Sequence, residues 1–115
     1  MHSLAVKIYD DIKKCNKQKQ KFSNYSKLKS IDDYAFSNSS IGIISIPSTV
    51  ECIKNHVFFG CKFLRKIEFE SNSELKKIDQ YSFSGSSINF VSIPSKVNQI
   101  GQFAFYGCQQ LRSIE

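Results

Sequence analysis

The sequence contains no tryptophan, one methionine, two prolines and two histidines among its 115 residues. Two histidines leave little material for acid–base catalysis. No apolar run approaches the roughly 20 residues that cross a bilayer as a helix. Charged residues interrupt the first ten positions, which is too early for the apolar region of a secretion signal. The sequence therefore predicts neither a membrane span nor an exported leader.

The formal net charge of +6 is confined to one end of the chain. Residues 1–30 contain eight lysines and two aspartates, which accounts for the whole excess. The segment 31–115 carries eight basic and eight acidic residues and is neutral. Because nucleic-acid binding depends on a basic surface, we expect no nucleic-acid partner for this larger segment.

A unit of 47 residues occurs twice in the chain. Each 47-residue unit divides further, since Phe36, Phe58, Phe83 and Phe105 are separated by 22, 25 and 22 residues. Such self-similarity is typical of a repeat protein, in which each coil buries its apolar edge against the next. Identical residues 47 positions apart include Leu28 and Leu75, Ile31 and Ile78, Phe36 and Phe83, Pro47 and Pro94, and Cys61 and Cys108.

The apolar spacing within a half-repeat predicts one short strand and a bend. Ile44 and Ile46 are two positions apart, so both side chains point to the same face of a strand. Pro47 then ends the strand, where no backbone N–H is needed for the ladder. A bend or a single helical turn closes the coil, with Phe58 filling the interior. On this pattern, most of the ten phenylalanines are expected to be packing residues, placed once in each coil.

The pattern resembles the BspA-like, or treponema-type, leucine-rich repeat. The match is best from Ser92 to Cys108, followed by Leu111 and Ile114, whereas Lys54 and Val57 depart from it. The resemblance implies an α/β leucine-rich repeat solenoid, right-handed, with short parallel strands on one face and turns or single helical turns on the other. It also implies a role at a cell surface, in adhesion or contact with a host or extracellular-matrix protein.

Two segments are expected. Residues 1–20 are basic, and their apolar spacing favours a helical N-terminal cap or a decayed coil over a membrane-binding or nucleic-acid-binding helix. Residues 21–115 form the solenoid, with about four to five coils. The sequence ends inside a predicted strand at Ile114, so we expect an open C-terminal end that can self-associate.

The cysteines and histidines do not form a recognisable reactive site. Cys61 and Cys108 lie two coils apart, about 10 Å at the usual strand spacing, which is too far for a disulfide. Cys52, His56 and Cys61 would suggest zinc, but a structural site needs four ligands, and the second unit does not repeat the set. We therefore predict no metal, no cofactor, no catalytic residue and no enzymatic activity.

Alternation along the strands predicts a binding face. If Ile44 and Ile46 point inward, the residues between them point outward. Ile43 and Phe90 occupy equivalent positions, and a row of exposed apolar groups indicates a contact surface, although packing against neighbours is an equal alternative. The candidate partner-binding residues are Ile43, Ser45, Lys66, Glu68, Phe90, Ser92 and Ser113.

These observations predict a non-enzymatic protein-interaction module. Two alternatives stay open at this level. A cytosolic scaffold or regulatory protein is favoured by the lack of a secretion signal. A fragment of a larger repeat array is favoured by the open end and by the decayed first coil.

Overall fold

The computed structural model of the chain describes residues 19–21 and 28–115. Within this part all regular elements are short strands, and no helix occurs. The predicted N-terminal helix lies outside the described residues. The strands are β1 (Lys19–Lys21), β2 (Ser30–Ile31), β3 (Ile43–Ile46), β4 (Cys52–Ile53), β5 (Lys66–Phe69), β6 (Lys77–Ile78), β7 (Phe90–Val91), β8 (Gln99–Ile100) and β9 (Ser113–Ile114).

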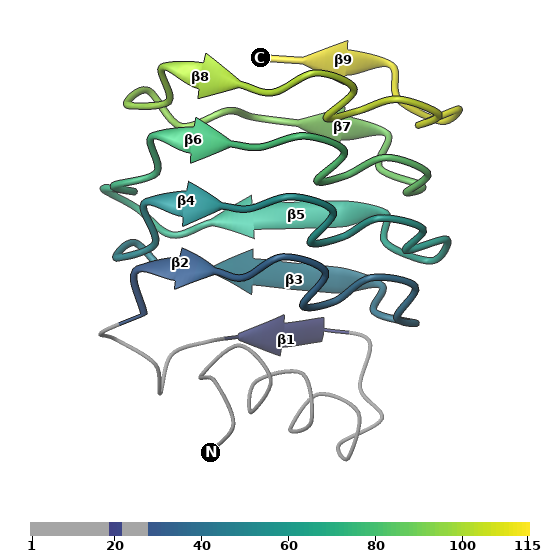
Figure 1. Cartoon of the computed structure of the whole chain (residues 1–115), viewed down its shortest axis with the longest axis horizontal. Helices are drawn as coiled ribbons and strands as arrows, with labels where there is room; N and C mark the ends of the chain where they lie inside the picture. The colour runs from purple at the N-terminus through teal and green to yellow at the C-terminus, as the bar shows by residue number, and fades with distance from the viewer. Residues whose placement is uncertain (1–18, 22–27) are drawn as a thin grey trace.

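The strands stack into two parallel layers that form the opposite walls of a right-handed solenoid (Figure 1). One layer contains β1, β3 and β5, followed by the separate pair β7 and β9. The other layer contains β2, β4, β6 and β8. The second layer was not anticipated, because the sequence pattern predicted strands on one face only. Each coil thus contributes one strand to each wall, and turns join the two.

The strand alternation places the predicted apolar residues inside. Ile44 and Ile46 are fully buried, and Ile44 aligns with Ile67 of the next coil. In the second layer Ile53 aligns with Ile78, and both are fully buried. Apolar side chains from both walls therefore meet in one continuous core, which is how a solenoid buries what a single coil cannot.

A ladder of phenylalanine rings runs through this core. The rings of Phe36, Phe58, Phe83 and Phe105 stack in sequence, with centroids 5.4, 5.2 and 5.3 Å apart. This confirms the prediction of one interior phenylalanine per coil. Phe69 also packs against this core, whereas Phe63, Phe90 and Phe103 are exposed. They belong to turns and to the outer strand face, where no interior space is available.

Each coil leaves its second strand through a tight turn with two left-handed residues. The backbone φ is positive at the second turn position, for example 58° at His56. It is positive again four residues later, for example 70° at Gly60. Positive φ is uncommon for residues other than glycine, and here it lets the chain reverse twice without a helical turn. The sequence analysis expected a bend or a single helical turn to close each coil, and these turns occupy that position.

At the opposite edge, prolines end the strands of alternate coils. The backbone N–H of Val50 donates to the carbonyl of Pro47, and that of Val97 donates to Pro94, both at 3.2 Å. Between them lies the longer coil, where Asn72 has a φ of 61°. This turn holds two of the three extra residues of the 25-residue coil, and the third lies at the other edge, between Phe58 and Leu64. The difference between 22 and 25 residues is therefore divided between the turns at the two edges.

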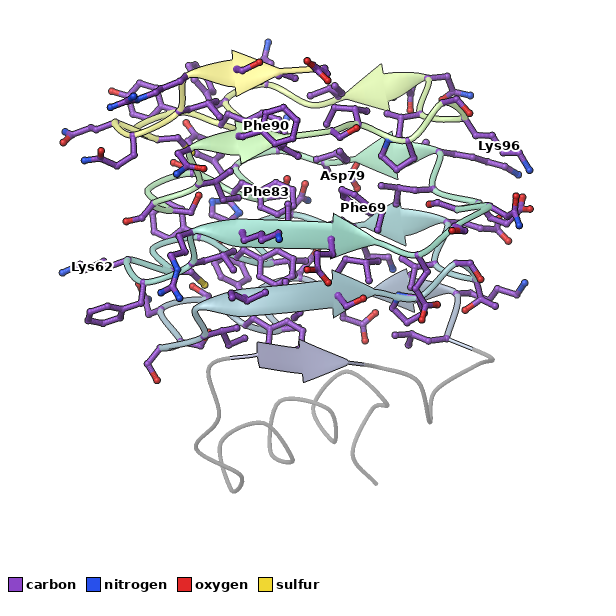
Figure 2. All side chains as sticks on the ribbon, turned by 180° about the vertical axis from the view of Figure 1, so that it is seen from behind. Lys62, Phe69, Asp79, Phe83, Phe90 and Lys96 are labelled. Atoms are coloured by element: carbon purple, nitrogen blue, oxygen red, sulfur yellow. The ribbon has the colours of Figure 1, made fainter. Side chains whose placement is uncertain are left out.

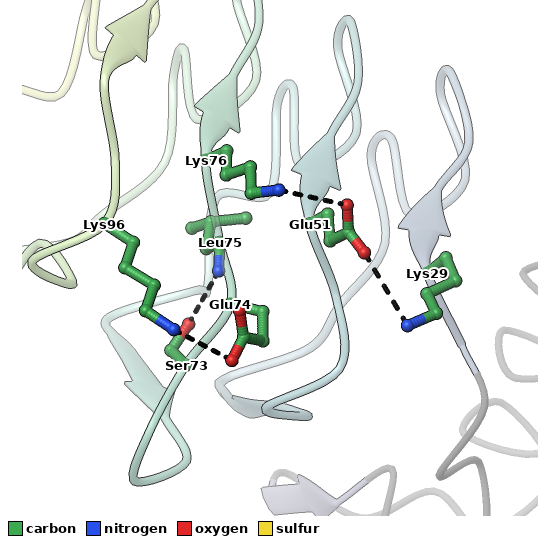
Figure 3. A network of polar contacts seen from close by, with 7 residues as sticks. All are labelled: Lys29, Glu51, Ser73, Glu74, Leu75, Lys76 and Lys96. Carbon is green, nitrogen blue, oxygen red and sulfur yellow. Dashed lines mark hydrogen bonds and ion pairs between the residues drawn. The ribbon is translucent and has the colours of Figure 1, made fainter.

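Charged side chains connect successive coils on the surface beside these turns (Figure 3). Glu51 lies between Lys29 and Lys76, with N–O distances of 3.6 and 3.7 Å. Lys96 donates to Glu74 at 2.9 Å. Solvent-exposed pairs of this kind contribute little to stability, so the core and not these pairs holds the stack together.

The first layer extends to β1, which pairs in parallel with β3 through the register Lys19 to Ile43. The predicted division between residues 1–20 and 21–115 falls inside β1. The rest of the basic segment lies outside the described residues.

Candidate functional site

The outer face of β3, β5, β7 and β9 carries the residues that the sequence analysis selected. The register aligns Ile43 with Lys66, and Ser45 with Glu68. Figure 2 looks onto this face and shows Phe90 projecting from β7. Side chains from successive coils thus stand in rows on one wall, as expected for parallel strands with buried alternate positions.

These candidates differ in accessibility. The exposed members include Lys66, Ser92, Ser113 and Phe90, whose side chain is 45% exposed. Ile43 and Glu68 are half-buried. Ser45 is only 8% exposed and has little surface to offer a partner. Ser45 lies in β3, the central strand of the three-stranded sheet.

The strand face is interrupted between β5 and β7. These strands contact one another but form no continuous ladder, so the first layer splits into two sheets. An open pocket of about 570 Å³ lies at the carboxyl ends of the two strands, lined in part by Phe69, Ser92 and Pro94. The longer turn after Phe69 and the residue Pro94 both lie beside this break. The sequence contains both features, but neither indicates a pocket by itself.

The turn edge of the solenoid carries a second aromatic ladder that the sequence analysis missed. His56 stacks between Tyr34 and Tyr81, with ring centroids 4.6 and 4.9 Å away, and Phe103 continues the row beyond Tyr81 at 5.1 Å. All four residues have φ between 56° and 60°. The signal was present, since these positions are 22, 25 and 22 residues apart. It was hidden because the four residues differ in type.

His56 and Tyr81 have a stacked ring on both faces, whereas the end rings Tyr34 and Phe103 have one on a single face. Aromatic pairs of this kind add about 0.5–1.5 kcal/mol each beyond their buried area. The imidazole Nδ1 of His56 is buried and has no hydrogen-bond partner. His56 is therefore held in the stack by ring contacts, a structural role that explains its place without catalysis or metal binding.

The thiols in the described part of the chain are free. Cys61 donates to the Phe36 carbonyl at 3.1 Å, and Cys108 donates to the Phe83 carbonyl at 3.0 Å. Ser86 occupies the equivalent position in the coil between them and lies 3.4 Å from the Cys108 sulfur. The two cysteines therefore act as small polar groups that bond to the preceding coil.

Burial and the neighbouring Asp79 carboxylate raise the pKa of the Cys52 thiol to about 11. Its sulfur also donates to an Asp79 oxygen at 3.6 Å. Burial raises the pKa of the Cys61 thiol as well. Since the thiolate is the nucleophile and the metal ligand, these groups are poorly suited to either task at neutral pH. Over residues 28–115, no three His, Cys, Asp or Glu side chains are grouped as a metal site.

Comparison with known families identifies the repeat. A family model described as BspA type leucine rich repeat region matches residues 8–115, in six copies. The chain belongs to the BspA-type leucine-rich repeat family. The match covers almost the whole sequence, and it confirms the fold class expected from the Ser92–Cys108 pattern.

Solved structures with the same fold include BspA-type relatives from several bacteria. The pneumococcal vaccine antigen PcpA is 27% identical with a TM-score of 0.71, over 75% of this chain and 23% of that one. The T. pallidum leucine rich repeat protein TpLRR is 26% identical with a TM-score of 0.56, over 75% of this chain and 51% of that one.

A leucine rich cell surface protein from Faecalibacterium prausnitzii A2-165 is 21% identical with a TM-score of 0.63, over 75% of this chain and 28% of that one. At this identity the likeness concerns the fold alone. The BspA-type chain spans about a quarter of the PcpA and F. prausnitzii chains and about half of TpLRR. No functionally curated protein matches it. Where the structure describes the chain, no helix has the length and apolar character needed to cross a membrane.

Proposed function

We propose that this BspA-type chain is a non-enzymatic protein-interaction module that binds its partner through the outer face of β3, β5, β7 and β9. The observation that carries the proposal is the arrangement of side chains on this face. Parallel register brings Ile43 beside Lys66, and Phe90 beside Ser113. Apolar and polar groups thus alternate over several coils, a composition suited to contact with another protein.

The chemistry of the remaining residues supports a binding role over a catalytic one. His56 is enclosed by rings. The Cys52 thiol has a pKa of about 11 and is protonated at neutral pH. General acid–base or nucleophilic catalysis needs groups whose pKa lies near the working pH. These two residues therefore contribute to folding in this proposal, not to a reaction.

The relatives suggest where such binding takes place. PcpA, to which the chain is 27% identical, is a vaccine antigen. On this likeness we extend the proposal to a cell-surface location and to a host or extracellular-matrix protein as partner. Leucine-rich repeat arrays offer an extended surface of stacked strands, which suits recognition of another protein.

The proposal can be tested by surface plasmon resonance of the full chain over immobilised fibronectin, collagen and laminin. The double variant Ile43→Ser with Phe90→Ser removes both apolar groups from the strand face. We expect at least one of the three proteins to bind, and its affinity to fall about tenfold in the variant, equivalent to 1.4 kcal/mol. Circular dichroism checks that the variant stays folded.

The matched control is Phe63→Ser, which removes an equally apolar side chain that is 65% exposed in a turn outside the strand face. This variant should bind as the unaltered chain does. The proposal fails if none of the three proteins binds, or if the double variant and the control lose affinity to the same extent.

A further inference from the structure

A second pocket on the strand face lies between the coils of β7 and β9. It has a volume of about 530 Å³. Strand pairing joins the backbone on its two sides, since the Arg112 N–H donates to the Asn89 carbonyl at 2.9 Å and Phe90 pairs with Ser113. Its lining residues are Ser87, Asn89, Phe90, Gln110, Arg112 and Ser113.

The pocket contains a guanidinium without an acidic partner. Some other cations on the surface are paired, such as Lys66 with Glu68 at 3.5 Å and Lys96 with Glu74 at 2.9 Å. The exposed Lys54, Lys62 and Lys77 form no ion pair within residues 28–115, but none of them lines this pocket. The Arg112 side chain is exposed and forms no hydrogen bond or ion pair within residues 28–115. A guanidinium presents five N–H donors in a planar fork whose geometry matches a carboxylate. The pocket is therefore complementary to an anion.

The groups around Arg112 favour a peptide as the source of this anion. Phe90 offers an apolar ring to the same pocket, and the exposed amides of Asn89 and Gln110 make no side-chain hydrogen bond in the described structure. Such amides can donate to and accept from a peptide backbone. Recognition of phosphate groups usually relies on clusters of arginines, whereas Arg112 is the single cation lining this pocket.

We propose that this pocket binds an acidic segment of the partner protein. The carboxylate of an aspartate or glutamate pairs with Arg112, and a neighbouring apolar side chain packs on Phe90. This inference rests on the proposed function and adds the chemistry of the partner. It also assigns roles to Arg112, Asn89 and Gln110, which the strand alternation alone did not select.

The test uses two synthetic peptides of glycine and serine, one with a central Leu-Asp-Leu and the other with Leu-Asn-Leu. The full chain is titrated with each peptide and followed by nitrogen–proton NMR. We expect the acidic peptide to shift the amide signals of Asn89, Phe90 and Arg112, and to bind about tenfold more tightly than the amide peptide. Raising the salt from about 50 to 500 mM should reduce this preference, because exposed charge pairs are screened.

Two variants remove the same charge at different places. Arg112→Gln should abolish the preference for the acidic peptide. Lys54→Gln, which follows β4 in the opposite wall and is also exposed, should leave it unchanged. Equal binding of the two peptides to the unaltered chain would overturn the inference, and so would a preference that survives in Arg112→Gln or is lost equally in Lys54→Gln.

The readout is separate from that of the proposed function. If Ile43 and Phe90 are required for binding a matrix protein but Arg112→Gln has no effect on peptide selectivity, the pocket inference fails and the interaction module stands. If the peptides bind selectively but no matrix protein binds, the pocket assignment stands and the choice of partner is wrong.

Discussion

Replacing Phe83 by alanine should be among the most destabilising single changes in the solenoid. The side chain is fully buried behind the strand face, and its ring stacks on Phe58 at 5.2 Å and on Phe105 at 5.3 Å (Figure 2). Removing a buried phenylalanine ring typically costs about 3–5 kcal/mol, and each aromatic pair adds about 0.5–1.5 kcal/mol. We therefore expect a loss of at least 4 kcal/mol, a large part of the roughly 5–15 kcal/mol that stabilises a typical domain.

Urea unfolding followed by far-ultraviolet circular dichroism measures this loss. Two variants separate its causes. Phe83→Leu keeps most of the buried volume but removes the stacking, so we expect a loss of about 1–2 kcal/mol. Phe63→Ala removes the same atoms from an exposed turn position and should change stability by less than about 0.5 kcal/mol. If Phe83→Ala and Phe63→Ala unfold at the same urea concentration, the ladder does not stabilise the stack as argued.

Two further predictions concern the turns and the thiols. Gly101→Ala should destabilise the chain by about 2–3 kcal/mol, because the added Cβ would lie 2.6 Å from the Gln80 backbone nitrogen. Gly85→Ala, whose φ is 77° and whose nearest atom is 3.6 Å away, should cost only the roughly 1–2 kcal/mol of a left-handed backbone. Thermal melts of both variants distinguish a steric clash from backbone strain, and equal losses would contradict the packing argument. The pKa of the Cys52 thiol in the folded chain is raised to about 11. The contribution of the protonated thiol to the free energy of unfolding is therefore complete below the ordinary thiol pKa of about 8.5, and it is lost as the pH rises toward 11. Iodoacetamide labelling of Cys52, measured by mass spectrometry, should be slow at pH 8 and faster in Asp79→Asn; an unchanged rate in that variant would refute the role of the carboxylate.

The sequence pattern predicted the interior of the solenoid well. Residues such as Ile53, Phe58 and Phe83 recur at offsets of 22 and 25, and all three are fully buried. This success has a physical cause: every coil occupies the same environment, so the same apolar residue is needed at the same place in each. A repeat protein therefore displays its core as periodicity, which a single sequence is enough to reveal.

The surface was predicted only in part. Alternation identified Phe90 as a member of the outer face, and it is exposed there. It did not identify Arg112, which precedes β9 and reaches the same pocket as Phe90 from the next coil. The aromatic row through His56 was missed as well, because its members share a backbone conformation and not a residue type. Surface positions tolerate variation between coils, so their periodicity is weak.

The sequence by itself determined the repeat, the length of each coil, the inward residues and the family, since these follow from local spacing that every coil must satisfy. Only the tertiary structure decided which outward residues become neighbours. That choice depends on the register between coils, which pairs residues as far apart in sequence as Phe90 and Ser113, about 23 positions. It also depends on the longer turn around Asn72, next to the break in the strand face, and on the direction in which each side chain points. Contacts of this kind are set by packing in three dimensions, and spacing along the chain does not record them.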